Sequence, residues 1–207
     1  MNFKGSVKKL WNLLWHDNSW KGWIFSIIIL FIFIKFIFLP GLTLITGTSL
    51  PLAIVESCSM YHSGADTDAT FERWWKTNEG KYEELSITKE NFKNYIFKNG
   101  FNKGEILFLV KATPSKLKIG DIITFQSDNK VIIHRIINIK KDNITEKYTF
   151  STMGDNNNGQ LSQEISIQEN QLVGKAFLSV APYIGWFKLI FFEGVKSPSE
   201  KGFCREN

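Results

Sequence analysis

Residues 23–39 read WIFSIIILFIFIKFIFL and carry a single charge, on Lys35. Phenylalanine and isoleucine would lie on every side of a helix over this stretch, so it lacks the polar face of an amphipathic core helix. The uncharged sequence continues beyond Pro40 as far as Glu56. Because a helix needs about 20 apolar residues to cross a bilayer, we predict a transmembrane anchor over residues 22–46. Proline disfavours helix at the preceding residue, so we also expect a kink or a helix end near Pro40.

The flanks of the anchor predict its orientation. Lysines and tryptophans are concentrated on its N-terminal side, at Lys4, Lys8, Lys9, Lys21, Trp11, Trp15, Trp20 and Trp23. Positive charge marks the cytoplasmic side of a span, and an aromatic belt marks the interface. We predict a cytoplasmic amphipathic segment over residues 1–21, with VKKLWNLLW at 7–15 lying on the inner leaflet. The protein would then be a single-pass protein of the cell membrane, with its body outside the cytoplasm.

Charge and cysteine content exclude several classes of protein. The chain of 207 residues has a net charge of +5, of which residues 1–35 contribute +4. The nearly neutral remainder is not the charge pattern of a nucleic-acid-binding protein, so we expect no nucleic-acid partner. Two cysteines are too few for a disulfide framework, and with three histidines they do not suggest a zinc site. Nothing in the sequence calls for a metal or an organic cofactor.

The chain after the anchor predicts a mainly β domain. Short β-branched runs bounded by turn residues predict strands over residues 106–110, 121–125, 131–139, 148–152 and 172–180. Residues 61–102 are richer in charged and aromatic residues and predict a small α-containing insert, in which Thr88 caps a helix over 88–98. Residues 181–192 predict a strand end and an interfacial anchor, with a second membrane segment over 176–192 as the alternative. Residues 193–207 form a C-terminal tail.

Three short motifs contain residue types that catalysis could use, although each alone is typical of an ordinary turn or strand. They are Ser57-Cys-Ser-Met60, Ile133-His-Arg135 and Gly154-Asp-Asn-Asn157. Gly120-Asp-Ile-Ile123 lies between the first and the second of these motifs. Val173-Gly-Lys175 and Pro182-Tyr-Ile-Gly185 follow the third. This ordered set resembles the type I signal peptidases, in particular their archaeal and endoplasmic-reticulum branch. The resemblance covers roughly residues 23–192 and leaves the insert unaccounted for.

The resemblance implies a signal-peptidase-like β fold, with a peptidase domain over residues 47–192. It implies a serine endopeptidase that removes signal peptides from exported precursor proteins, with membrane lipid and the translocation machinery as candidate partners. Ser59 would be the nucleophile and His134 the base, because a hydroxyl becomes nucleophilic only when a neighbour accepts its proton. The Ser59 backbone N–H and the Ser57 hydroxyl would hold the oxyanion. Ile54 and Val55 would line shallow substrate pockets, and Met60 would touch the pocket or the membrane.

The acid that orients the histidine is where the sequence departs from the family. The family places a second aspartate six residues after that of the Gly-Asp-Asn-Asn motif, and here that position is Leu161. Either Asp155 or, after a loop shift, Glu164 takes the role, with a slight preference for Asp155. Asp121 is a third candidate, better suited to a structural role at its strand start.

Other reactive residues and other functions compete with this interpretation. His16 precedes the anchor, and His62 follows Ser59 so closely that only a tight turn would join them. Cys58 alternates away from its serine neighbours on a strand, and we expect it to pack as a small apolar side chain. The absent second aspartate favours a catalytically inactive, membrane-anchored binding or scaffold module. A membrane serine protease of other specificity is the remaining alternative.

Overall fold

The computed structural model describes residues 5, 11, 19–62, 68–128, 130–197 and 200–205. The chain forms two compact units, Met1–Ile45 and Thr46–Asn207. Of the predicted amphipathic segment at 7–15, all but Trp11 lies outside the described residues.

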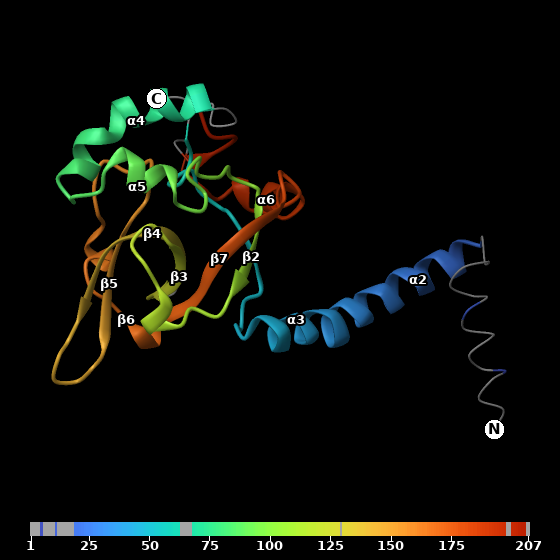
Figure 1. Ribbon diagram of the computed structural model, residues 1–207. Helices are drawn as coiled ribbons and strands as arrows, with labels where there is room; N and C mark the ends of the chain where they lie inside the picture. The colour runs from blue at the N-terminus through green and yellow to red at the C-terminus, as the bar shows by residue number, and fades with distance from the viewer. Residues whose placement is uncertain are drawn as a thin grey trace. The chain divides into compact units, whose positions relative to one another are not determined.

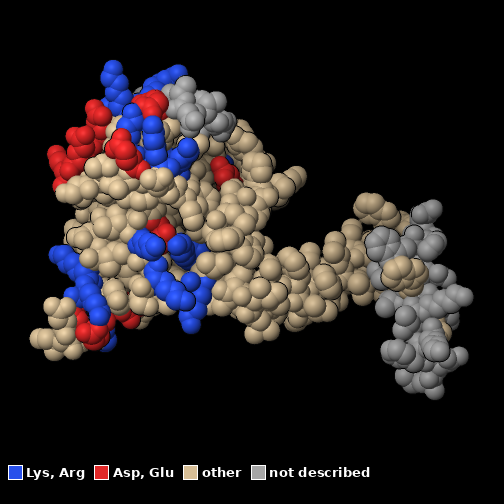
Figure 2. All heavy atoms as spheres, in the orientation of Figure 1, with Lys and Arg blue, Asp and Glu red and all other residues tan. Residues whose placement is uncertain are grey.

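From residue 20 onward the first unit is one long apolar helix. It comprises α2 (Trp20–Phe33), a π-helical turn η1 (Ile34–Phe38) and α3 (Leu39–Thr46), and the Ser19 hydroxyl caps its start by accepting from the Gly22 N–H at 3.1 Å. In the described part of the chain it is the single helix long and apolar enough to cross a membrane. Its visible face in Figure 2 is uncharged, whereas charged side chains crowd the second unit, above all over the insert.

Of the two alternatives expected near Pro40, a kink or a helix end, the helix end is wrong, because the helix continues to Thr46. The irregularity lies one turn earlier, where the Leu39 N–H donates to Ile34 O, five residues back. Proline has no N–H, and its ring clashes with the carbonyl four residues earlier in an α-helix. A π-helical turn is a known way to absorb such an interruption without ending a helix.

The second unit contains a seven-stranded antiparallel sheet, which confirms the mainly β fold (Figure 1). Its strands are β1 (Leu52–Ile54), β2 (Ile106–Val110), β3 (Ile122–Ser127), β4 (Lys130–Lys141), β5 (Tyr148–Met153), β6 (Ile167–Gln168) and β7 (Leu172–Ala181). They are arranged in the order β1-β2-β7-β3-β4-β5-β6. Five of the strands, β2, β3, β4, β5 and β7, coincide with predicted strands. Short 3₁₀ turns lie between strands: η2 (Pro114–Lys116) between β2 and β3, η3 (Ser162–Glu164) between β5 and β6, and η4 (Glu169–Gln171) between β6 and β7.

The insert contains two helices, α4 (Asp68–Glu83) and α5 (Lys89–Lys93), which lie over β3–β5 in Figure 1. The predicted cap is present, because the Thr88 hydroxyl accepts from the Asn91 N–H and the Asn91 side chain returns to the Thr88 N–H. The helices pack an aromatic cluster against the sheet residues Ile137 and Met153. Trp74 and Trp75, 5% and 2% exposed, belong to this cluster, so they are core residues of the second unit.

The C-terminal part of the chain is fastened to the body. Helix α6 (Trp186–Glu193) is only eight residues long, so among the described residues the alternative of a second membrane segment over 176–192 has no helix to form it. Buried Lys103 donates to the carbonyls of Glu200 and Gly202 and pairs with the Glu193 carboxylate. A disulfide joins Cys58 to Cys204. The expectation that Cys58 packs as a free apolar side chain is therefore wrong, because its partner lies 146 residues away in sequence and no spacing pattern reveals it.

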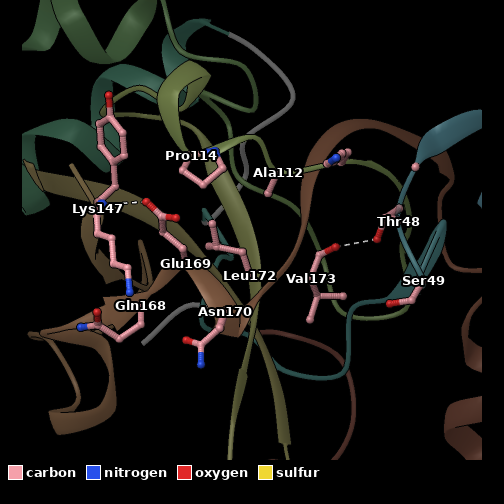
Figure 3. Close-up of a pocket in the computed structure, with 13 residues that line it drawn as sticks. Thr48, Ser49, Ala112, Pro114, Lys147, Gln168, Glu169, Asn170, Leu172 and Val173 are labelled. Atoms are coloured by element: carbon pink, nitrogen blue, oxygen red, sulfur yellow. Dashed lines mark hydrogen bonds between the residues drawn. The ribbon is translucent and has the colours of Figure 1, made fainter. Parts of the chain in front are cut away.

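The second unit also has a hollow of about 800 Å³ (Figure 3). Its wall includes the segment that follows α3, where the Thr48 hydroxyl donates to Val173 O at 2.6 Å. It also includes Lys111 and Lys147, but neither Ser59 nor His134. The residues predicted to carry chemistry therefore lie outside this hollow.

Candidate active site

Three side chains from distant parts of the chain form a hydrogen-bonded chain. His134 Nε2 lies 2.8 Å from Ser59 Oγ, although 75 residues separate them. On the opposite side of the imidazole, Nδ1 contacts Glu164 Oε1 in a short hydrogen bond. His134 and Glu164 are buried, whereas Ser59 is half-exposed. This is the serine–histidine–carboxylate arrangement in which the imidazole is held by one nitrogen and faces a hydroxyl with the other.

Local structure explains how each member is placed. Ser59 lies in the turn after the edge strand β1, where the Tyr61 N–H donates to Cys58 O at 3.1 Å. His134 lies on β4, an inner strand of the sheet, and is paired with Ile123 of β3. Glu164 ends η3, and its carboxylate accepts from the Thr152 hydroxyl at 3.0 Å and the Leu161 N–H at 2.9 Å. Leu161 thus holds the acid through its backbone at the position where the family has an aspartate.

Asp155 is not hydrogen-bonded to His134. Its hydrogen bonds go to other residues, which contradicts the preference for it as the orienting acid. It is fully buried and accepts from Arg135 Nη2 at 2.6 Å, the Tyr82 hydroxyl at 2.8 Å and His62 Nε2 at 2.9 Å. Since neighbouring strand residues point to opposite faces, Arg135 leaves β4 away from His134. Asp155 therefore belongs to a separate buried cluster with the insert. Asp121 pairs with Lys175 at 2.7 Å, as a structural residue would.

Burial and charge act against each other in this buried cluster. Burial alone would raise the pKa of Asp155, but the Arg135 guanidinium and the hydrogen bonds from His62 and Arg135 hold that pKa well below its ordinary value. Burial lowers the pKa of His62 despite the Asp155 carboxylate beside it. Burial also raises the pKa of the Tyr82 hydroxyl well above its usual range. The cluster therefore contains a carboxylate paired with a guanidinium and a neutral imidazole.

The predicted substrate-contacting residues divide into two groups. Ser57 is exposed, and its hydroxyl lies 3.1 Å from Ser59 Oγ, within reach of a developing oxyanion at the nucleophile. Ile54 is partly exposed at the end of β1. Val55 and Met60, 4% and 1% exposed, belong to the hydrophobic core, and Met60 Sδ accepts from the Asp155 N–H at 3.5 Å. The expectation that Met60 touches the pocket or the membrane is therefore wrong, and Val55 offers almost no surface to a substrate.

The turn over residues 154–157 braces the nucleophile segment. Asn156 donates its N–H to Ser59 O at 2.8 Å and its side-chain amide to Cys58 O at 3.0 Å. A Cβ on Gly154 would lie 2.8 Å from Ser59 O and 2.9 Å from His134 Nε2, so a glycine is needed for these elements to approach so closely. Sequence reasoning missed the contributions of His62, Tyr82 and Lys81 because the insert has no counterpart among the recognised motifs.

The comparisons with known proteins agree with this geometry. The chain is 35% identical over 105 residues to the signal peptidase complex catalytic subunit SEC11 of Candida tropicalis and 34% identical over 105 residues to that of Candida albicans. The curated relatives are signal peptidase catalytic subunits. These two matches cover 46% of this chain and 60% of each relative, and a match to the Lachancea thermotolerans SEC11 is 38% identical over 61 residues, 28% of this chain and 36% of the relative.

The similarity to SEC11 confirms the resemblance to the endoplasmic-reticulum branch of the type I signal peptidases. The chain spans about 60% of the length of these two Candida SEC11 proteins. No known family profile matches the chain.

Proposed function

We propose that this chain is a membrane-bound serine endopeptidase that removes signal peptides from exported precursor proteins. The observation that carries the proposal is the hydrogen-bonded chain from Ser59 through His134 to Glu164. The similarity to SEC11 catalytic subunits narrows the substrate class from proteins in general to signal-peptide-bearing precursors.

The mechanism follows from the contacts of the three side chains. His134 Nε2 accepts the Ser59 hydroxyl proton as Oγ attacks the scissile carbonyl, and the imidazolium then protonates the leaving amine. Glu164 accepts from Nδ1–H, which fixes the tautomer and stabilises the positive charge that forms on the ring. Water enters in the second half of the reaction, when His134 activates it against the acyl-enzyme. Glu164 remains an acceptor throughout.

Oxyanion stabilisation and substrate binding are assigned to the nucleophile segment and the strand before it. The Ser59 N–H and the Ser57 hydroxyl would donate to the oxyanion, and loss of one such donor lowers the rate about 10²–10³-fold. Strand β1 is at one end of the sheet order, so among the described strands one of its edges has no neighbour. An extended precursor segment can add to that edge, with Ile54 beside its side chains.

The membrane placement is also part of the proposal. The anchor would cross the cell membrane with the N-terminus in the cytoplasm, so that the second unit lies outside. The Cys58–Cys204 disulfide supports this side, because disulfides persist outside the reducing cytosol. Exposed Phe187, Ile190 and Phe191 of α6 suit an interfacial contact with lipid. After mild reduction, a membrane-impermeant maleimide should label the cysteines on intact cells; labelling only after lysis would contradict this orientation.

The activity is tested with the detergent-solubilised protein and a secretory precursor. Wild-type protein should cut at one signal junction, and Ser59→Ala and His134→Ala should each lower kcat by about 10⁶-fold, as for other serine–histidine enzymes. Ser115→Ala, an exposed serine in η2, is the matched control and should cleave normally. No cleavage by wild type would support the scaffold alternative, and scattered cuts would support a protease of other specificity.

A further inference from the structure

A lysine of the insert binds the turn that braces the nucleophile segment. Lys81 lies in the last turn of α4, and its ammonium donates to Asp155 O at 2.5 Å and to Asn157 O at 3.0 Å. These two carbonyls belong to the turn that follows β5. Lys81 therefore bridges the residues on either side of Asn156.

The residue between those two carbonyls supports the nucleophile. Asn156 makes both of its donor contacts, backbone and side chain, to the consecutive carbonyls of Ser59 and Cys58. A continuous chain of hydrogen bonds thus runs from α4 through residues 155–157 to Ser59. Its last member carries the hydroxyl that faces His134.

The contacts of Lys81 fit a role in positioning the backbone of residues 155–157 rather than a direct role in catalysis. It is half-buried, its ammonium lies 5.4 Å from the centre of the Tyr82 ring, and burial lowers its pKa while Asp155 partly opposes that effect. Its two recorded hydrogen bonds go to main-chain carbonyls rather than to Ser59 or His134. Any influence on the reaction is therefore exerted through the turn.

We propose that Lys81 is a positioning residue for the nucleophile: together with the Tyr82 and His62 contacts to Asp155, it lets the insert hold Ser59 at hydrogen-bonding distance from His134. This inference rests on the proposed peptidase function for its kinetic part. It assigns the insert a role: without the Lys81 clamp the turn and the nucleophile segment move together away from the imidazole. Misplacement of a reacting group by about 1 Å can cost on the order of 10²-fold in rate.

The kinetic test compares Lys81→Met with Lys76→Met on the same precursor. Lys76 lies on the same helix, is exposed and has no recorded partner among the described residues, so it is a matched control. Lys81→Met should lower kcat about 10–100-fold and leave KM within about twofold, because substrate binding on β1 is untouched. Lys81→Arg, which keeps the donors, should recover most of that loss. Equal kcat in Lys81→Met and Lys76→Met would overturn the proposal.

A second readout does not depend on catalysis. Hydrogen–deuterium exchange should speed up at the amides of residues 57–61 and 155–157 in Lys81→Met and stay at the wild-type rate in Lys76→Met. If wild type cleaves no precursor, the peptidase proposal fails while this measurement still decides the positioning role. Unchanged exchange in the two segments, or a slowing of exchange, would overturn it.

Double substitution separates positioning from general stability. Asn156→Ala removes the side-chain contact to Cys58 O from an exposed residue and should fold normally. If Lys81 acts through the turn, the kcat loss of Lys81→Met combined with Asn156→Ala should be smaller than the product of the two single losses. Fully multiplicative losses would show that Lys81 acts by another route and would overturn the proposal.

Discussion

The second unit contains two buried histidine–carboxylate pairs that look alike and differ in what surrounds them. In the pair His134–Glu164 the second ring nitrogen reaches the Ser59 hydroxyl. In the pair His62–Asp155 the second nitrogen, Nδ1, has no hydrogen-bond partner among the described residues, and the ring stacks on Trp74 at 3.6 Å between centroids. A histidine–carboxylate pair is therefore not by itself evidence of catalysis. What distinguishes the two pairs is the group that faces the second ring nitrogen, the one not bonded to the carboxylate.

The carboxylates differ as well. Glu164 is held by neutral donors, Thr152 and the Leu161 N–H, so its charge is available to an imidazolium. Asp155 is already paired with the Arg135 guanidinium through three hydrogen bonds. An acid neutralised in this way gains little from a second cation. In the proposed mechanism the first pair moves a proton, whereas the contacts of the second pair hold the insert on the sheet.

The largest difference between the pairs should appear in kcat for precursor cleavage. Glu164→Gln keeps the shape of the acid but loses its charge and leaves the His134 tautomer unfixed, so kcat should fall on the order of 10³–10⁴-fold. The melting temperature of Glu164→Gln, measured beside its precursor cleavage rate, separates this effect from unfolding. Glu169→Gln, another acid in a 3₁₀ turn, is the control and should cleave normally. A rate within tenfold of wild type would remove Glu164 from the mechanism.

The next effect should appear in stability. Asp155→Asn leaves the Arg135 charge buried without its partner, which typically costs about 3–5 kcal/mol. We expect urea unfolding to report such a loss, with a smaller fall in kcat than for Glu164→Gln. If Asp155→Asn instead lowered kcat by 10³-fold or more without destabilisation, Asp155 would be the catalytic acid and the comparison would be reversed.

Gly154 lies between the two pairs and tests how closely they are packed. In Gly154→Ala the new methyl group must displace Asn157 Nδ2, Ser59 O and His134 Nε2, which all lie within 3 Å of its ideal position. We expect a fall in kcat of about 10²-fold, since the reacting groups are forced apart. Gly159→Ala is the control because nothing lies within 4 Å of its Cβ. Equal rates in the two variants would show that the site relaxes freely.

Sequence patterns predict the parts of this molecule that depend on local periodicity. The anchor, five strands and the Thr88 cap follow from spacing and turn chemistry, and the order of motifs selects Ser59 and His134. The acid could not be chosen, because the spacing of Asp155 and Glu164 in the sequence does not show which of them reaches His134. The same limit hides His62 and Tyr82, whose partner Asp155 is more than 70 residues away in sequence. It also hides the Cys58–Cys204 disulfide, which depends on where the chain end returns.

The smallest expected effect is on the pH dependence of the free energy of unfolding. Because burial lowers the pKa of His62 in the folded protein, the unfolded chain binds the extra proton first as the pH falls below about 6.5. The free energy of unfolding should therefore decrease between about pH 6.5 and 5.5, by at most about 1.4 kcal/mol per pH unit for this group. The low pKa of Asp155 acts in a different window: its stabilisation is present above about pH 4 and is lost as the pH falls further.

His62→Phe isolates the contribution of His62. Phenylalanine keeps a ring against Trp74 and cannot titrate, so the variant should be less stable at pH 7 through the lost Asp155 hydrogen bond but lose less stability on going to pH 5.5. Titration of other groups is common to both proteins and cancels in the difference. Urea unfolding of both proteins at the two pH values measures it. A steeper pH dependence in His62→Phe than in wild type would mean that His62 is protonated in the folded state, and the second pair would then be an ion pair rather than a neutral support.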